Sequence, residues 1–252
     1  MPAPQTVELD VAVIGGGVAG LWLLNRLQQT GYQSALFETK ALGSEQTVAS
    51  QGMIHGGIKY TLSGALSGAS EAIADMPAHW QACLQGQGDV DLRGANVLSD
   101  HFYMWSSASV TSKLTTFFAS KAARGRVDKV DKQSRPAVFQ HPGFKGQLYR
   151  LVDMVLDVPS VVSVLSQQAS GQTYLLPANH RWQKNAQGHC ELLIEQAGQQ
   201  LHIKAKRFIF TAGKGNGALL ENLGVTQPAM QTRPLHQVMV KHKHPHPFYG
   251  HC

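Results

Sequence analysis

A glycine-rich run near the N-terminus, GGGVAG at residues 15–20, has the residue types and spacing of a nucleotide-binding turn. Gly15, Gly17 and Gly20 occupy the three glycine positions of the GxGxxG pattern. The first glycine permits a tight turn, the second lets a pyrophosphate approach the backbone, and the third allows close packing of helix on strand. The unpaired N–H groups at the start of such a helix attract phosphates. The run therefore predicts dinucleotide binding, against the alternative of a purely structural glycine turn.

A carboxylate follows this run at the place where a ribose would lie. Apolar spacing predicts a strand over 7–14, a helix over 18–29 and a second strand over 34–38, which is the crossover that a parallel strand pair needs. Glu38 ends the second strand, 18 positions beyond Gly20. Its carboxylate can accept both hydroxyls of an adenosine ribose, and it would repel the 2′-phosphate of NADP.

Two later segments distinguish FAD from NAD. TVASQG at 47–52 and HGGIKY at 55–60 form a loop of small residues whose hydroxyls can cap a helix beside a second pyrophosphate face. FIFTAG at 208–213 reads as a buried strand that ends in another glycine turn, after an antiparallel meander. An NAD domain would more simply continue with alternating strands and helices. Two glycine turns separated by an inserted mixed domain favour FAD.

Taken together, GGGVAG, Glu38, VASQGMIHGGIKY and FIFTAGKGN resemble the FAD-dependent oxidoreductases of the D-amino-acid oxidase superfamily. IHGGIKY and the later RPLHQVMVK are most similar to the branch of FAD-linked glycerol-3-phosphate dehydrogenases and 2-hydroxy-acid oxidases. The resemblance covers most of residues 7–241 and is vague between 85 and 145. It implies an α/β fold in which a Rossmann-like FAD-binding domain carries a mixed antiparallel-sheet substrate domain.

The resemblance also implies a set of cofactor-binding positions. The glycine turn and Glu38 would hold the ADP half of FAD, and the residues around 50–52 would lie along the pyrophosphate and flavin side. The turn at 212–213 would close over the cofactor at the second crossover. The expected cofactor-binding residues are Gly15, Gly16, Gly17, Val18, Ala19, Gly20, Phe37, Glu38, Thr39, Lys40, Thr47, Ser50, Gln51, Gly52, Ala212 and Gly213.

The expected reaction is oxidation of a small CH–OH or CH–NH substrate by hydride transfer to the flavin, with oxygen or a quinone as electron acceptor. His55 can remove the substrate proton, or it can serve the loop structurally. Lys59 and Arg233 are cations that can pair with a substrate carboxylate or phosphate, or lie on the surface. By the resemblance, His251 lies on a strand that faces the flavin. The expected catalytic residues are His55, His251 and Arg233.

The resemblance divides the chain into four segments. Residues 1–85 and 151–225 would form the FAD-binding domain, 86–150 the substrate domain or insertion, and 226–252 the start of a substrate-domain strand. Relatives carry a further glycine-rich motif near their C-terminus, which these 252 residues lack. We therefore expect a truncated family member. A catalytically inactive FAD- or ADP-binding fragment is the alternative function.

The apolar pattern beyond residue 38 predicts further elements. The expected helices are 71–84, 113–123 and 157–168, and the expected strands are 96–105, 147–156, 174–182, 189–196, 201–210 and 237–241. His242, His244 and His246 alternate near the end and would share a strand face able to bind zinc. Pro245 and Pro247 interrupt any such strand, so we expect a polar loop and no metal.

Composition limits the partners and the compartment. An apolar fraction of 43% excludes a disordered chain, and a net charge of +6 favours anionic partners without naming one. Nine Lys or Arg residues lie between 113 and 150. We interpret them as a solvated surface and expect no nucleic-acid partner, with a flavoprotein that acts on RNA as a third hypothesis.

The cysteines and the N-terminus favour an intracellular location. Cys83, Cys190 and Cys252 lie far apart and form no CxxC, which indicates reduced thiols. Residues 1–10 lack the basic and apolar regions of a signal peptide. The apolar stretch 11–24 contains four glycines and is too short to span a bilayer. We expect a cytoplasmic protein without a transmembrane segment, and peripheral contact with the inner membrane stays open.

Overall fold

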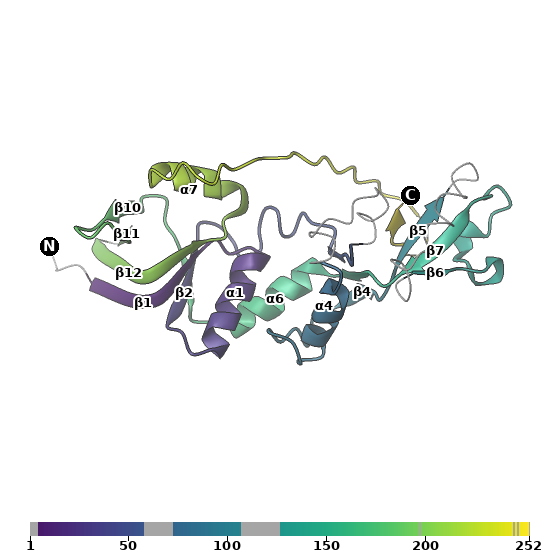
Figure 1. The fold of residues 1–252 in the computed structure, drawn as a ribbon, viewed down its shortest axis with the longest axis horizontal. Coiled ribbons are helices and arrows are strands. Elements are labelled where there is room, and N and C mark those ends of the chain that lie inside the picture. Colours follow the sequence, from purple (N-terminus) through teal and green to yellow (C-terminus); the bar gives the residue numbers. More distant parts are fainter. Residues whose placement is uncertain are drawn as a thin grey trace. The chain divides into compact units, whose positions relative to one another are not determined.

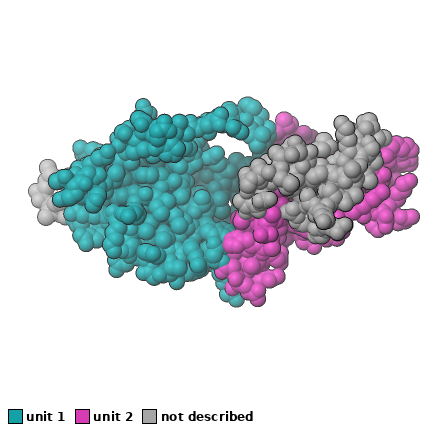
Figure 2. All heavy atoms as spheres, viewed as in Figure 1, with its two compact units in different colours: residues 1–50, 89–94, 158–237 teal, residues 51–88, 95–157, 238–252 magenta. Residues whose placement is uncertain are grey.

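The chain forms two compact units in a computed structural model (Figure 2). The structure describes residues 5–57, 73–106, 127–196, 198–243, 245 and 247–251. Unit 1 comprises residues 1–50, 89–94 and 158–237, and unit 2 comprises residues 51–88, 95–157 and 238–252. Each unit is therefore assembled from three separate stretches of the sequence.

Unit 1 is built on a six-stranded sheet with the strand order β10-β11-β12-β1-β2-β9 (Figure 1). The four strands from β12 to β9 run parallel, and β10 and β11 extend them as an antiparallel meander. The strands are β1 (Gln5–Ile14), β2 (Ser34–Glu38), β9 (Thr173–Leu175), β10 (Arg181–Lys184), β11 (Cys190–Gln196) and β12 (Gln199–Phe210). This arrangement confirms the α/β fold class.

Helix α1 (Val18–Gln29) forms over the expected residues. Leu21 and Leu24, one helical turn apart, are fully buried beneath the sheet. Gly31, at φ +84°, allows the backbone to turn just beyond the helix end. Asn25 joins this helix to α6 (Val158–Gln168), because its buried side-chain amide donates to the Leu165 carbonyl oxygen at 3.0 Å. The two helices therefore lie side by side (Figure 1).

The core of unit 1 explains why its central strands read as continuous apolar runs. The last four residues of β1, Val11–Ile14, are all buried, and so are residues 34–37 of β2. Parallel strands with both faces covered have this pattern, whereas half-exposed strands alternate. Leu36 is fully buried, and replacing such a leucine by alanine costs about 2–5 kcal/mol. The carboxyl end of β1, where the turn to α1 begins, is therefore anchored in the buried core.

The described residues of unit 2 form two small sheets. The four-stranded sheet has the order β13-β5-β7-β6, and the three-stranded sheet has the order β3-β8-β4. The strands are β3 (Met53–Ile54), β4 (Val97–Ser99), β5 (Phe102–Ser106), β6 (Val127–Lys129), β7 (Gln147–Leu151), β8 (Met154–Leu156) and β13 (Gly250–His251). Among the described residues, the further helices are α4 (Met76–Leu84) in unit 2 and α7 (Asn216–Asn222) in unit 1. The 3₁₀ turns described are Lys132–Ser134 and Ala137–Phe139 in unit 2 and Gly213–Gly215 in unit 1.

Three segments that we expected to form one strand each are divided into two strands. The strand over 96–105 is two strands, β4 and β5, and the strand over 147–156 is also two, β7 and β8. In both cases the two halves join different sheets, so the chain turns at 100–101 and at 152–153. The strand over 174–182 divides into β9 and β10 because the chain turns through Pro177, which cannot donate to a ladder. Apolar residues stand on both sides of such a turn, so the apolar pattern does not reveal the turn itself.

The remaining expectations have mixed outcomes. The strand over 237–241 is wrong: no described residue pairs with it, and Val238, Met239 and Val240 are 73–96% exposed. The helix expected over 71–84 begins at Met76, after a turn at 73–75. The helix expected over 113–123 lies outside the described residues.

Candidate functional site

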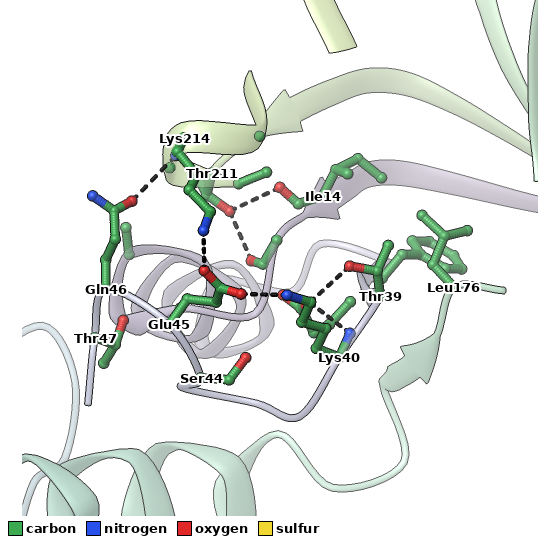
Figure 3. A pocket seen from close by; sticks show the side chains of 18 of the residues that line it. Ile14, Thr39, Lys40, Ser44, Glu45, Gln46, Thr47, Leu176, Thr211 and Lys214 are labelled. Atoms are coloured by element: carbon green, nitrogen blue, oxygen red, sulfur yellow. Dashed lines mark hydrogen bonds and ion pairs between the residues drawn. The ribbon is translucent and has the colours of Figure 1, made fainter. Parts of the chain in front are cut away.

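A cavity of about 570 Å³ lies in unit 1 at the carboxyl ends of β1, β2 and β12. Ligands of open α/β sheets bind at this edge of the parallel strands. Figure 3 shows the side chains that surround it. Twelve of the sixteen expected cofactor-binding residues line this cavity. They are Gly15, Gly17, Val18, Ala19, Phe37, Glu38, Thr39, Lys40, Thr47, Ser50, Ala212 and Gly213.

The glycine turn is locked against the end of β12. Gly15 has φ +113°, and a Cβ on it would lie 2.6 Å from the Ala212 nitrogen. A Cβ on Gly20 would lie 1.9 Å from the Gly15 oxygen. The Thr211 hydroxyl donates to the carbonyl oxygens of Ile14 and Gly15, at 3.1 and 2.8 Å (Figure 3). The first and third glycines are therefore required by the chain itself, whatever occupies the cavity.

Helix α1 presents its N-terminus to the cavity. Its first residue follows Gly17, which has no side chain to cap the helix, and the Val18 N–H donates instead to the Thr47 hydroxyl at 3.1 Å. The N–H of Ala19 has no acceptor among the described residues, and Ala19 is exposed in the cavity wall. Free donors and the positive end of the helix dipole make this wall attractive to an anion.

Glu38 closes the turn from the end of β2. One carboxylate oxygen accepts the Gly16 N–H at 2.5 Å, and the other accepts the Lys40 N–H at 2.8 Å and the Thr39 hydroxyl at 3.2 Å. The carboxylate therefore fixes the glycine turn while it lines the cavity. Gly16 and Gly20 do not line the cavity, and both shape its wall from behind.

Residues 10–250 match the family of FAD dependent oxidoreductases. The chain belongs to this FAD-dependent oxidoreductase family. It is 47% identical over 249 residues to a probable FAD-dependent oxidoreductase of Pseudomonas aeruginosa, a match that covers 99% of this chain and 62% of that protein. The chain thus spans less than two thirds of that relative's length.

Three solved structures share the fold of this chain. The crystal structure of a Pseudomonas aeruginosa FAD dependent oxidoreductase has a TM-score of 0.71 and 38% identity, over 91% of this chain and 54% of that chain. Glycine oxidase from Geobacillus kaustophilus has a TM-score of 0.65 and 17% identity, over 86% and 58%. The FAD-bound L-alpha-glycerophosphate oxidase of Mycoplasma pneumoniae has a TM-score of 0.59 and 17% identity, over 85% and 56%. The resemblance inferred from the sequence motifs is confirmed, and FAD is the cofactor of the family.

Sequence reasoning missed a charged bridge in the lining of this cavity. The Glu45 carboxylate pairs with the ammonium groups of both Lys40 and Lys214 (Figure 3). The hydrogen bond from Lys214, followed by that from Lys40, lowers the pKa of Glu45 from 4.5 to about 2. The Lys214 N–H also donates to the Gln46 side-chain oxygen at 3.1 Å. The loop over 39–50 is thereby tied to the turn after β12, and no spacing pattern signals these contacts.

His55 has a partner that the sequence did not reveal. It follows β3 directly, Asp153 precedes β8 directly, and the antiparallel register pairs Ile54 with Met154. This register brings the His55 Nδ1 to 3.1 Å from one Asp153 oxygen. The other oxygen accepts the Gly56 N–H at 2.9 Å, and Asp153 is 3% exposed. A buried carboxylate therefore orients the imidazole, and the Phe102 ring lies edge-on to it at 6.3 Å.

The other expected site residues are placed as follows. Gln51 and Gly52 belong to unit 2, where the Gly52 oxygen accepts the Leu156 N–H at 2.9 Å, and neither lines the cavity of unit 1. Arg233 lies in an exposed stretch, and its Nε donates to the Gln231 side chain at 3.1 Å.

Of the remaining residues that the sequence singled out, His251 is described, whereas several others are not. The backbone of His251 pairs with Met104 in β5. Lys59, His244 and His246 lie outside the described residues, and so does Cys252. Within the described part of the chain, no helix is both long and apolar enough to cross a membrane.

Proposed function

We propose that the cavity of unit 1 holds the ADP half of FAD. The observation that carries this proposal is the convergence of a free helix N-terminus and an oriented carboxylate on one cavity. The Ala19 N–H supports a phosphate site, because a donor that faces the cavity gains a partner there. A volume of about 570 Å³ falls within the ordinary range for small-molecule sites, roughly 300–1,000 Å³.

Glu38 would hold the adenosine ribose without releasing the glycine turn. A carboxylate offers about four acceptor positions, and the structure uses three of them, for Gly16, Thr39 and Lys40. An acceptor position therefore remains for a ribose hydroxyl. The bond from Gly16 keeps the carboxylate in place before the nucleotide arrives, so that little side-chain freedom is lost on binding.

We also propose that the protein oxidises a small CH–OH or CH–NH substrate. Bound FAD supplies the two-electron acceptor for such a reaction. His55 supplies the proton acceptor: when its Nδ1–H donates to Asp153, its Nε2 carries a lone pair and can take the substrate proton. Its side chain is 33% exposed, so the ring is reachable, while the buried Asp153 keeps its orientation.

The substrate class and the electron acceptor extend this proposal. A 61-residue stretch is 41% identical to glycerol-3-phosphate dehydrogenase of Pseudomonas tolaasii, over 24% of this chain and 12% of that protein. Together with the glycine oxidase and glycerophosphate oxidase folds, this supports a small polar substrate with oxygen or a quinone as acceptor. Neither Cys83 nor Cys190 forms a disulfide in the described part of the chain, which supports a reducing compartment such as the cytoplasm.

The test is anaerobic reduction of the FAD-reconstituted chain. Mixing with 2-hydroxy acids, amino acids or glycerol phosphates should bleach the flavin absorbance for at least one of these classes. The His55→Asn variant should bind FAD as the wild type does and bleach at least ten-fold more slowly. A chain that binds FAD but is bleached by none of them would contradict the oxidase proposal and leave nucleotide binding without turnover.

A further inference from the structure

Unit 2 contains a second cavity that none of the preceding arguments uses. It has a volume of about 580 Å³ and is lined entirely by residues between 132 and 147, around the two 3₁₀ turns. Its ionisable lining residues are Lys132, Arg135, His141 and Lys145, and none of the described acidic residues lines it. At neutral pH this cavity carries three positive charges before any charge on His141 is counted.

Arg135 is the unusual member of this lining. It is only 7% exposed, and its guanidinium lies 5.2 Å from the centre of the Phe144 ring. One terminal nitrogen donates to the Gly146 oxygen at 3.3 Å, and the buried Nε has no hydrogen-bond partner within the described residues. No carboxylate of the described part of the chain pairs with Arg135.

An arrangement of this kind is costly unless a ligand completes it. Burying an unpaired charge, or leaving a buried donor without an acceptor, destabilises a folded protein. The cation–π contact with Phe144 offsets only part of this cost. The guanidinium stays charged at neutral pH, and its planar set of N–H donors fits carboxylate and phosphate oxygens. An oxyanion in the cavity would supply the opposite charge that Arg135 lacks among the described residues.

The surrounding groups favour a doubly charged oxyanion. Lys132 and Lys145 are exposed at the cavity, where their flexible ammonium groups can reach a bound anion. The Nδ1 of His141 accepts the Gly143 N–H at 3.0 Å, so the neutral ring carries its proton on Nε2 and offers a further donor. Three cations match a dianion better than a single carboxylate.

We propose that this cavity binds a phosphate monoester, with Arg135 as the buried anchor and Lys145 as an exposed second cation of the lining. The phosphate belongs either to a free small molecule or to a phospholipid whose headgroup is itself a phosphate monoester, as in phosphatidic acid, and both present the same dianionic group. This site is separate from the proposed FAD cavity and does not depend on it, because all its lining residues lie within 132–147 of unit 2.

The test is calorimetric titration of the full chain with inorganic phosphate, and sedimentation with vesicles that contain phosphatidic acid or phosphatidylcholine alone. We expect saturable phosphate binding that Arg135→Gln weakens at least ten-fold and Lys145→Gln several-fold. Lys129→Gln is the matched control, because this exposed lysine of β6 does not line the cavity, and it should bind as the wild type does. Since the cavity of unit 1 also offers donors to phosphate, only the binding lost in Arg135→Gln is assigned to this site.

The outcomes separate the two sources. Arg135-dependent sedimentation with phosphatidic acid vesicles but not with phosphatidylcholine indicates a lipid headgroup, and phosphate binding without vesicle binding indicates a free phosphate ester. Arg135→Gln should unfold no more readily than the wild type in phosphate-free buffer, because it removes an unpaired buried charge. If it fails to fold, Lys145→Gln carries the test. Absence of binding to both probes, or equal affinities in wild type and the Arg135 and Lys145 variants, overturns the proposal.

Discussion

The hydroxyl of Thr47 accepts the backbone N–H of Val18 at 3.1 Å, across 29 positions of sequence. Helix α1 begins after Gly17, which has no side chain to cap it. Thr47, from the loop that follows β2, supplies the cap instead. The same hydroxyl lines the cavity beside the free end of the helix. One side chain thus links the stability of α1 to the shape of the proposed nucleotide site.

Replacing Thr47 by valine should lower the free energy of unfolding by about 1 kcal/mol, the usual cost of losing an N-cap acceptor. Thr47→Ser keeps the oxygen and should stay close to the wild type. Urea denaturation of the three proteins measures the difference. Equal stability of the valine variant and the wild type would show that the bond contributes nothing.

Two helical glycines should respond to alanine in opposite directions. Gly20→Ala places a Cβ 1.9 Å from the Gly15 oxygen and should destabilise the protein by about 3 kcal/mol. Gly217→Ala in α7 meets its nearest atom, on Met230, at 3.9 Å and should stabilise the protein by about 0.5–1 kcal/mol. Thermal unfolding of both variants checks the pair. A neutral Gly20→Ala would mean that the turn adjusts freely.

The bridge at Glu45 should make stability depend on acid pH. Its hydrogen bond from Lys214, and then that from Lys40, lower its pKa from 4.5 to about 2, so the folded state favours the charged form. The contribution is fully present above pH 4.5 and is lost as the pH falls towards 2. The difference in unfolding free energy between wild type and Glu45→Gln should therefore shrink over this range. A difference that stays constant with pH would contradict the bridge.

Asp153 should control the tautomer of His55. With aspartate, the Nδ1–H of the neutral ring donates to the carboxylate, whereas Asp153→Asn can donate to Nδ1 and move the proton to Nε2. Nitrogen-15 NMR of the labelled imidazole should show this change, with slower flavin bleaching in the same variant. Asp100→Asn, beside the neighbouring His101, is the control and should leave the His55 signals unchanged. An unchanged tautomer in Asp153→Asn would exclude this positioning role.

Local signals allowed the N-terminal third of unit 1 to be predicted closely. The helix over 18–29 matches because its apolar residues recur at helical spacing and Gly31 follows its end. The strand over 34–38 matches because it is a short, almost continuously buried run. The strands over 96–105 and 147–156 were predicted as unbroken because apolar residues stand on both sides of each turn, although Val97, Leu98 and Val152 are 39–48% exposed. A contact with a distant partner leaves no local pattern.

In the candidate site, too, the local motif could be predicted from the sequence and the long-range contacts could not. The glycines and Glu38 belong to one short motif, so their spacing predicted their shared cavity. Asp153 reaches His55 across 98 positions through strand register, and Glu45 joins Lys214 from a different crossover. Arg135 stands out only once its burial and missing carboxylate are seen. The spacing of residues in the sequence reveals neither these long-range contacts nor the burial of Arg135.

The most direct test of the central claim is the affinity of the full chain for FAD, followed by the change in flavin fluorescence on titration. The wild type should bind FAD saturably. Glu38→Ala should weaken binding roughly 10–100-fold through loss of a charged acceptor, and Gly17→Val should weaken it further by filling the wall of the turn. Glu8→Ala, an exposed carboxylate of β1, should bind as the wild type does. Unchanged FAD affinity in both the Glu38 and Gly17 variants would contradict the account.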